Sequence, residues 1–326
     1  MEDKGTKSLL DFYTRARENK KEIVLRTKDG KEYSKAEMTV LACLSIYARS
    51  LLDEEHSIDY DKVIKMIILN SLEGKFDGLK KQDEFEDLVR DSKFTFTNEG
   101  YAARTAYERM ISDFSTYLFP IYPEEKFIYE NTKLHDVPRK GHVYWGNKSD
   151  RIENVLEHIY GCLVLSLGLE SEYNYCVDFN KMRRMLLIHE TGEIIEKDET
   201  AWDISAKERH EKEKRAVTII SQTLPGGCGK ELIDLWKEFE EKISLVSEFA
   251  YLTDKEQYDI EVRLNEKEGL YDYPNVPQNV VTTNPEIVRL MKEEAHSVFD
   301  VHYLTDKDKY SRVPVFRRLL EETKNY

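Results

Sequence analysis

Apolar residues recur every three or four positions along most of this chain, which is the spacing of one face of an α-helix. The clearest runs in the first part of the chain are at 36–53, 58–74, 80–119 and 151–169. Asp59 is placed to cap the second of these helices, because its side chain can accept a backbone N–H bond at a helix start. No segment alternates with the period of two that half-buried strands show. The pattern therefore predicts an all-α fold with little or no sheet.

The stretch from Ile121 to Asp150 interrupts this pattern. It is rich in charge and turn residues, so we expect a connector or a long surface loop there. Further helices are expected at 177–195, from Ser205 to the turn at 225–227, at 231–264 as one helix or two, and at 285–299 and 313–324. The connector divides the chain into two predicted units, 1–125 and 126–326.

The net charge and the cysteines limit the partners and the cell compartment that we expect for this protein. The formal net charge of -14 repels a polyphosphate backbone, which argues against a long nucleic acid but leaves room for a mononucleotide. No apolar run approaches the roughly 18 residues of a membrane span, and the first residues lack the apolar core of a signal peptide. The four cysteines, Cys43, Cys162, Cys176 and Cys228, show no CxxC pairing and are interpreted as ordinary thiols. We therefore expect a cytoplasmic protein with no membrane partner.

A metal site is the chemistry that the sequence suggests most directly. His158 lies in the middle of an apolar helical segment, and His189 and Glu190 close another. Buried imidazole and carboxylate groups are costly unless they are paired or ligated, and they are the donors that divalent metals accept. Glu193 lies one turn beyond His189, and Asp254 lies in a third helical stretch. Taken singly, each has an ordinary explanation as a hydrogen-bonded core histidine or a surface acid.

The order of these residues resembles the His…His-Asp…Asp signature of HD-domain metal-dependent phosphohydrolases. The likeness is greatest to the 5'-deoxynucleotidase-like branch and covers about residues 136–260. Its motifs resemble PRKG at 138–141, RIENVLEH at 151–158, HETGEIIEKD at 189–198 and LWKEFEEKISLVSEFAYLTDK at 235–255. The resemblance implies that 126–326 is an all-helical HD-domain bundle.

The resemblance also implies roles for individual residues. The positions that match the family's ligands for one divalent ion are His158, His189, Glu190 and Asp254. Mn, Co, Mg, Zn and Fe are not distinguished. Such an ion lowers the pKa of a bound water and neutralises phosphate charge. Glu193 would transfer a proton or orient the water, Asp198 would position groups around it, and Arg139 would clamp a phosphate with its guanidinium.

Three positions depart from the family pattern. Glu190 stands where the family has Asp, so its carboxylate is one methylene further from the backbone, which bears on activity and metal choice. Lys197 replaces a glycine, and His142 replaces a common Trp. Trp145 and Trp202 are candidates for stacking on a base, with a core or rim aromatic as the alternative.

The N-terminal unit contains a candidate repeat of the HD unit. Residues 58–74 align with 177–193, and 39–51 align with the helix around His158. In that register the residues at the places of His158, His189 and Glu190 are Cys43, Asn70 and Ser71. The alignment predicts a degenerate HD-like copy without ligands, and the alternative is a chance likeness of amphipathic helices. Such a copy would pack against the active unit, cover its mouth or mediate a homodimer.

Three functions are open at this point. The first is metal-dependent hydrolysis of a small nucleotide, with a deoxynucleoside 5'-monophosphate as the expected substrate. The second is another HD-type nucleotide phosphodiesterase or triphosphohydrolase, which additional Lys and Arg around the pocket would favour. The third is a non-catalytic nucleotide or metal sensor, suggested by Glu190 and by the ligand-free first unit.

Overall fold

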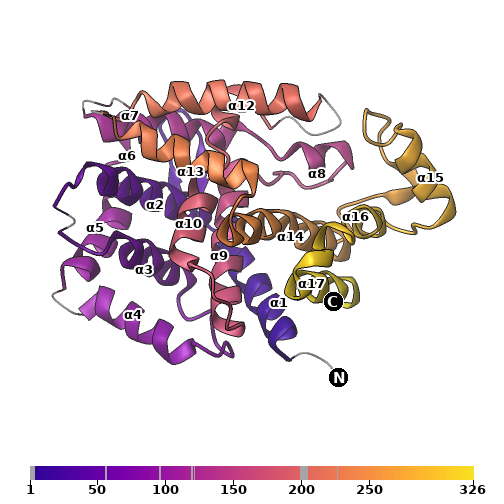
Figure 1. The fold of residues 1–326 in the computed structure, drawn as a ribbon, viewed down its shortest axis with the longest axis horizontal. Coiled ribbons are helices and arrows are strands. Elements are labelled where there is room, and N and C mark those ends of the chain that lie inside the picture. Colours follow the sequence, from indigo (N-terminus) through magenta and orange to yellow (C-terminus); the bar gives the residue numbers. More distant parts are fainter. Residues whose placement is uncertain are drawn as a thin grey trace.

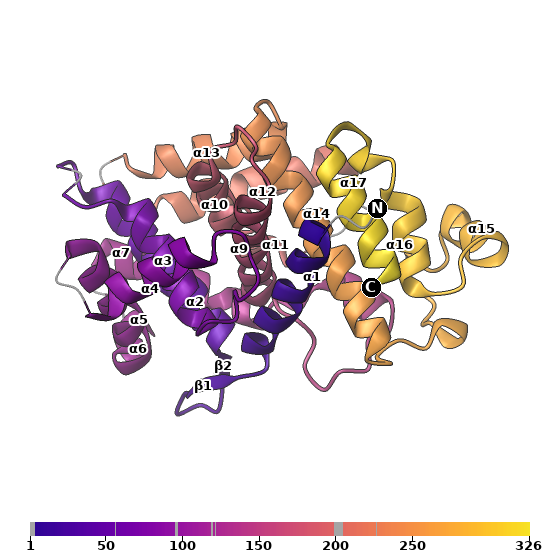
Figure 2. The same ribbon diagram turned by 90° about the horizontal axis from the view of Figure 1, so that it is seen from below.

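A buried central helix, α9 (Val155–Glu172), organises the fold. This computed structural model describes residues 4–55, 57–94, 97–118, 120, 122–198, 205–225 and 227–326. Almost every residue of α9 is buried, as expected for a helix that is apolar on all sides. In both views α9 lies between the helices of residues 35–112 and those of residues 245–325, and the first helix of the chain lies on the latter side (Figures 1 and 2). One hydrophobic core includes residues from both predicted units.

The first unit consists of helices and one short hairpin. The helices are α1 (Lys4–Arg17), α2 (Lys35–Leu52), α3 (Tyr60–Leu72), α4 (Gln82–Phe94), α5 (Asn98–Ser112) and α6 (Phe114–Leu118), with a 3₁₀ turn at Glu18–Lys20. Asp59 caps α3 by accepting the backbone N–H of Lys62, as predicted. The antiparallel hairpin pairs β1 (Ile23–Arg26) with β2 (Glu32–Ser34) and is the only sheet in the described part of the chain. The all-α prediction is confirmed.

The second unit supplies the remaining helices. They are α7 (Pro123–Thr132), α8 (Lys140–Tyr144), α9, α10 (Phe179–Ile188), α11 (Glu193–Glu196), α12 (Ala206–Ser221), α13 (Gly229–Glu241), α14 (Leu245–Lys267), α15 (Pro285–Glu293), α16 (Val298–Asp306) and α17 (Pro314–Asn325), with 3₁₀ turns at Lys133–Asp136, Tyr273–Asn275 and Lys309–Arg312. Ser205 caps α12 by accepting the N–H of Glu208. Of the helices described, none has both the length and the apolar character needed to cross a membrane.

Some segments fold differently from their sequence pattern, among them 177–195, which is divided into α10 and α11. Residues 121–150, expected as a connector or loop, contain α7 and α8. Pro123 occupies the first turn of α7, where its missing N–H removes no helical bond, and Phe127 anchors that helix in the core. The helix expected at 285–299 is divided into α15 and α16, because Ser297 forms a new N-cap. At the starts of α7 and α16, local capping overrides the apolar spacing.

The two units meet at the first turns of α2 and α9. Each helix begins with a capping box, Ser34 with Glu37 and Asn154 with Glu157. The boxes also bond to each other, because Ser34 Oγ donates to Glu157 Oε1 at 2.9 Å. In return, Asn154 Nδ2 donates to Glu37 Oε1 at 2.7 Å. In the predicted repeat, α2 is the equivalent of α9. The boundary near residue 125 and the degenerate copy remain predictions, which superposing 36–119 on 151–255 would test.

Candidate active site

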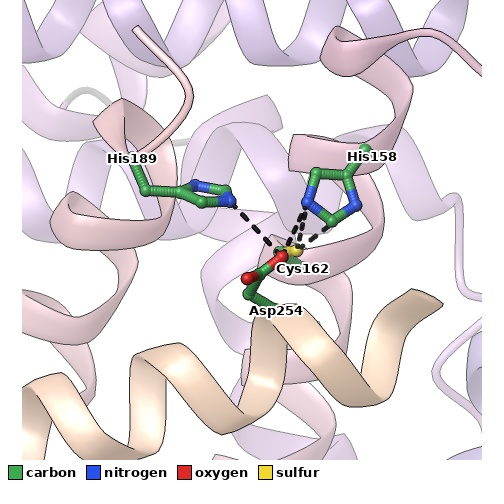
Figure 3. Close-up of side chains that lie close together, drawn as sticks. All are labelled: His158, Cys162, His189 and Asp254. Carbon is green, nitrogen blue, oxygen red and sulfur yellow. Dashed lines mark hydrogen bonds and ion pairs between the residues drawn. The ribbon is translucent and has the colours of Figure 1, made fainter. Parts of the chain in front are cut away.

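Three helices bring His158, His189 and Asp254 together (Figure 3). His158 lies on α9, His189 directly follows α10, and Asp254 lies on α14. Asp254 Oδ1 is 3.0 Å from His158 Nε2 and 3.7 Å from His189 Nε2, and the two imidazole centroids are 5.4 Å apart. All three residues are buried. The imidazoles are therefore close enough to share one ion, on which the predicted site depends.

The Nδ1 atoms of both histidines are already engaged elsewhere. His158 Nδ1 lies 2.5 Å from Gln257 Oε1, and His189 Nδ1 lies 2.8 Å from the carbonyl oxygen of Leu186. The Gln257 amide is oriented by its Nε2, which donates to Tyr13 Oη at 2.9 Å. Because Nδ1 of each imidazole faces an acceptor, Nδ1 can donate its hydrogen there and leave the Nε2 lone pair available to a metal ion. This is the arrangement of metal-binding histidines.

His189 Nε2 provides a test of whether the residues fit a metal. This atom is buried and has no hydrogen-bond partner among the described residues. Leaving a buried polar atom unsatisfied costs about 1–3 kcal/mol. A divalent ion would satisfy His189 Nε2, and two imidazoles with carboxylates form a donor set that borderline divalent metals accept. The cluster therefore fits a metal site.

Glu190 extends its carboxylate to the same point. Its Oε1 is 3.4 Å from His158 Nε2 and 3.6 Å from His189 Nε2. Glu190 Oε1 also accepts a hydrogen bond from Arg139 Nη1 at 2.7 Å. Burial alone would raise the pKa of Glu190, but Arg139 and the two imidazoles outweigh burial and hold the pKa below its ordinary value. The longer side chain thus brings an ionised carboxylate to the imidazoles.

Cys162 joins the cluster, which the sequence analysis did not anticipate. It follows His158 by one turn of α9, and its Sγ lies 3.7 Å from His158 Nε2. Burial, and then the charge of Asp254, raises the pKa of this thiol well above its ordinary value. Because the thiolate is the form that binds metals, the carboxylate of Glu190 is the better fourth donor. The spacing of four residues from His158 places both on one helix face and was the available signal.

Arg139, Asp198 and Glu193 lie beside the cluster and bond one another. Arg139 Nη1 donates to Asp198 Oδ1 at 3.0 Å, and the backbone N–H of Lys140 donates to Asp198 Oδ2 at 2.6 Å. The backbone N–H of Asp198 donates to the Glu193 carboxyl group. Burial, followed by the charges of Glu190 and Asp198, raises the pKa of Glu193 to about 9. Glu193 therefore carries a proton at neutral pH.

These groups face a cavity of about 390 Å³, which is within the size range of small-molecule sites. Arg139, Glu193 and Asp198 line it together with His189, Glu190 and Asp254. Residues of α16 form part of its wall, so the C-terminal region, which carries no recognisable motif, helps to build the site. Trp145 also lines the cavity, while Trp202 lies outside the described residues.

Charges on the cavity wall are largely paired. Besides Arg139, the basic residues of the lining are Arg209, Lys242, Lys255 and Lys309. Arg209 lies 3.4 Å from Glu213, Lys255 lies 2.8 Å from Asp254, and Lys309 lies 2.7 Å from Asp306. Lys242 Nζ lies over the Tyr251 ring, 4.1 Å from its centroid. Much of the basic charge is thus offset by neighbouring acids.

Known proteins resemble part of this chain. A family model described as HD domain matches residues 132–293. The 5'-deoxynucleotidase HDDC2 of Homo sapiens is 32% identical over 170 residues, covering 49% of this chain and 79% of that protein. HDDC2 of Bos taurus is 31% identical over 170 residues, covering 49% and 78%. The 5'-deoxynucleotidase YGK1 of Saccharomyces cerevisiae is 28% identical over 128 residues, covering 38% and 57%.

One solved structure is also similar. A predicted metal-dependent phosphohydrolase from Magnetospirillum magnetotacticum MS-1 has 23% sequence identity and a TM-score of 0.43, covering 62% of this chain and 94% of that one. The sequence relatives carry the assignment, because two of them exceed 30% identity and are matched over more than three quarters of their own length. The chain therefore belongs to the HD-domain family.

Proposed function

We propose that this protein hydrolyses the phosphate ester of a small nucleotide, a deoxynucleoside 5'-monophosphate, with the help of one divalent metal ion. The observation that carries the proposal is the convergence of His158, His189 and Asp254 beside a ligand-sized cavity, which His189 and Asp254 line. The relatives named 5'-deoxynucleotidase support the substrate class.

The proposed metal ligands come from three segments of the chain. They are His158, His189, Glu190 and Asp254. When bound, a divalent ion acts as a Lewis acid toward a phosphoryl oxygen and lowers the pKa of water. The hydrogen bonds to His158 Nδ1 and His189 Nδ1 hold both rings with Nε2 toward Asp254, so the ligand geometry is set before an ion arrives.

Arg139 is the proposed phosphate-binding residue. Its Nη1 is fixed by Glu190 and Asp198, and its Nε is buried with no hydrogen-bond partner in the described part of the chain. With Nη1 held in place, the remaining N–H groups of the guanidinium are available to phosphate oxygens. The planar fork of these groups matches the spacing of phosphate oxygens. Asp198 would keep Arg139 and the start of α8 in place through its bonds to Arg139 and Lys140.

Glu193 is the proposed proton-transfer residue. Its carboxyl group lines the cavity, and its raised pKa of about 9 keeps it protonated near neutral pH. A protonated carboxyl group in that position can donate to a departing oxygen or orient the attacking water. In both roles Glu193 faces the reacting phosphate and is not a ligand of the metal ion.

The charges of the lining favour one phosphate over three. A triphosphate needs several unpaired cations, but Arg209, Lys255 and Lys309 each lie beside an acid. The alternative is a nucleotide phosphodiesterase or triphosphohydrolase of the same fold. Cyclic nucleotides and triphosphates are therefore the comparison substrates in the assay. A sensor without catalysis is disfavoured by Glu190, since its carboxylate reaches both imidazoles despite the extra methylene.

A reducing compartment suits the cysteines of this protein. All four, Cys43, Cys162, Cys176 and Cys228, are unpaired. Because unpaired thiols in a chain of this size are typical of reducing compartments, the cytoplasm is the proposed location.

Phosphate release from a nucleotide panel tests the function. The panel contains deoxynucleoside and ribonucleoside 5'-monophosphates, triphosphates and cyclic nucleotides, each with Mn²⁺, Co²⁺ or Mg²⁺. We expect turnover of deoxynucleoside monophosphates, and we expect His189→Ala to lower kcat/KM at least about 100-fold, because a metal ligand supports several kcal/mol of transition-state stabilisation.

His296→Ala is the matched control, because His296 is exposed and lies outside the cavity lining. This variant is expected to keep wild-type kcat/KM. Full activity of His189→Ala would remove the proposed site from the mechanism. Binding of nucleotides without turnover of any of them, with every metal, would instead support the sensor.

A further inference from the structure

Two residues of the cavity lining, Tyr258 and His302, carry buried polar atoms without partners, Oη and Nε2. Both are shielded from solvent and have no hydrogen-bond partner among the residues that the structure describes. Both residues line the cavity, and their rings meet edge to face with centroids 5.1 Å apart. Buried polar atoms without partners are uncommon in folded proteins. Two of them in one cavity indicate a ligand that bonds to both.

The position of Tyr258 relates this pair to the metal-ligand cluster. Tyr258 follows Asp254 by four residues on α14, so the two side chains lie on one helix face with their Cβ atoms about 6 Å apart. A ligand whose phosphate lies at the metal cluster would therefore have its next groups beside Tyr258. His302 reaches the same place from α16, where its ring contacts the Tyr258 ring.

Aromatic neighbours hold both rings in place. Trp145 meets His302 edge to face with centroids 5.6 Å apart, and His142 lies 4.9 Å from Tyr258. A Cβ atom at Gly141 would lie only 2.2 Å from Tyr258 Oη, so the hydroxyl group requires glycine at that position. Because these side chains are already ordered, little conformational entropy is lost when a ligand binds.

The chemistry of the pair suits an uncharged, planar group. Burial lowers the pKa of His302 to about 4, and burial raises the pKa of Tyr258 well above its ordinary value, so both side chains are neutral near pH 7. Val281, Ile287 and Val301 add apolar surface to the same cavity. Neutral hydrogen-bonding groups with aromatic and apolar walls match the edge and faces of a nucleobase, whereas a phosphate would require cations.

We propose that Tyr258 and His302 form the nucleobase subsite of this protein, with the phosphate held at the Arg139 end of the cavity. This inference rests on the proposed nucleotide phosphohydrolase function. His302 lies on α16 (Val298–Asp306), beyond residues 132–293 that the HD-domain model matches. The subsite is therefore built partly by a region outside the family match, and it determines which nucleotide binds.

Substrates with and without a base test this subsite. We would measure kcat/KM for a deoxynucleoside 5'-monophosphate and for deoxyribose 5-phosphate in the wild type, Tyr258→Phe and His302→Phe. Each substitution keeps a ring and removes the polar atom. We expect the ratio of the two kcat/KM values to fall about tenfold in each variant, the scale of one lost hydrogen bond to a buried partner.

Tyr303→Phe is the control, because it removes a hydroxyl group of α16 that bonds to Glu321 instead of lining the cavity. Its ratio is expected to match the wild type. An unchanged ratio in both test variants, at wild-type melting temperature, would overturn the subsite and leave the phosphohydrolase function standing. Equal decreases in kcat/KM for both substrates would also overturn the subsite, because that result would assign Tyr258 and His302 to the sugar, which both substrates contain.

Equilibrium dialysis separates the two proposals if the wild type hydrolyses neither substrate. Weaker binding of the nucleoside monophosphate by Tyr258→Phe and His302→Phe would keep the subsite and discard the hydrolysis. Equal binding by the wild type and both variants, or no binding at all, would discard the subsite as well.

Discussion

Lys197 is held in a backbone conformation that suits glycine. Its φ angle is 70°, in the left-handed region, and Asp198 follows with a φ of 50°. That region costs a residue with a Cβ atom roughly 1–2 kcal/mol, whereas glycine enters it freely. The glycine that the family pattern has at this position is thereby explained. In this chain Lys197 and Asp198 both adopt the strained left-handed conformation, and Asp198 bonds to Arg139.

Lys197→Gly is expected to stabilise the protein. Relief of the left-handed strain outweighs the added flexibility of glycine in the unfolded chain, which costs about 0.4–1 kcal/mol. We expect the free energy of unfolding to rise by about 0.5–1 kcal/mol in denaturant titrations. Lys292→Gly, in the helix α15, is the opposite control and should lose about 1 kcal/mol. A loss of stability in Lys197→Gly would show that the Lys197 side chain contributes more than its backbone conformation costs.

Sequence reasoning found the residues that lie in local motifs and missed those that depend on distant contacts. His158, His189 and Asp254 could be selected because each stands in a motif of known order. Gln257 and His302 could not, since neither lies in a motif position that we could interpret. Gln257 bonds to His158 and is oriented by Tyr13, which is 244 positions away. His302 lies in a region without a motif. Only the folded chain brings such pairs together.

Among the secondary-structure elements, α1 belongs to the first unit yet supports the site of the second. Tyr13 Oη donates to Glu261 at 2.8 Å and accepts from Gln257, which in turn bonds His158. Lys20, just after α1, bonds the same Glu261 carboxylate at 2.5 Å. The orientation of a proposed metal ligand is thus fixed by a helix outside the residues of the HD-domain match.

Tyr13→Phe is expected to weaken metal binding about tenfold, the lower end of what is lost when a group that orients a metal-binding histidine is removed. Calorimetric titration of Mn²⁺ into the full chain measures this without reference to turnover. Tyr60→Phe is the control, because its hydroxyl group bonds to Asp53 in the first unit. An unchanged dissociation constant in Tyr13→Phe would mean that Glu153, 3.2 Å from Gln257 Nε2, orients the amide alone.

Element boundaries were predictable where a cap or a breaker is local. Asp59 and Ser205 were recognised as helix starts, and both cap the helices α3 and α12. The helix α7 was missed because its ten residues show too little apolar period, although Pro123 followed by two glutamates is a helix-start pattern. The break before α16 depends on Ser297, which the apolar spacing of 285–299 does not reveal.

At the scale of the whole molecule, a buried carboxyl group between α14, α16 and α17 bears on stability. Asp259 on α14 accepts from Tyr310 Oη at 2.7 Å, but its Oδ1 has no partner in the part of the chain described. Burial, and then the charge of Asp306, raises the pKa of Asp259 well above its ordinary value, while Lys309 opposes this shift. Glu256 lies one turn away and is also buried.

The contribution of Asp259 to stability is therefore expected to fall as pH rises. Between the ordinary aspartate pKa of about 3.9 and its raised folded value, Asp259 holds a proton when folded and releases it on unfolding. The free energy of unfolding then decreases by up to about 1.4 kcal/mol per pH unit. Asp259→Asn removes this contribution, so the stability of the variant relative to the wild type should increase as pH rises above about 4.

Chemical denaturation at several pH values measures this difference. Glu241→Gln is the control, because Glu241 is exposed at the end of α13 and its removal should leave the pH slope unchanged. Parallel slopes for Asp259→Asn and the wild type would show that Asp259 does not hold a proton in the folded protein.

The reciprocal hydrogen bonds between the N-terminal caps of α2 and α9 have a practical consequence. The surface that covers the start of α9 is tethered to it by the same polypeptide, so its effective concentration does not depend on how much protein is in solution. A separate subunit in that place would leave on dilution. We therefore expect the contact between α2 and α9 to persist from concentrated stocks to trace amounts, because it cannot dissociate by mass action.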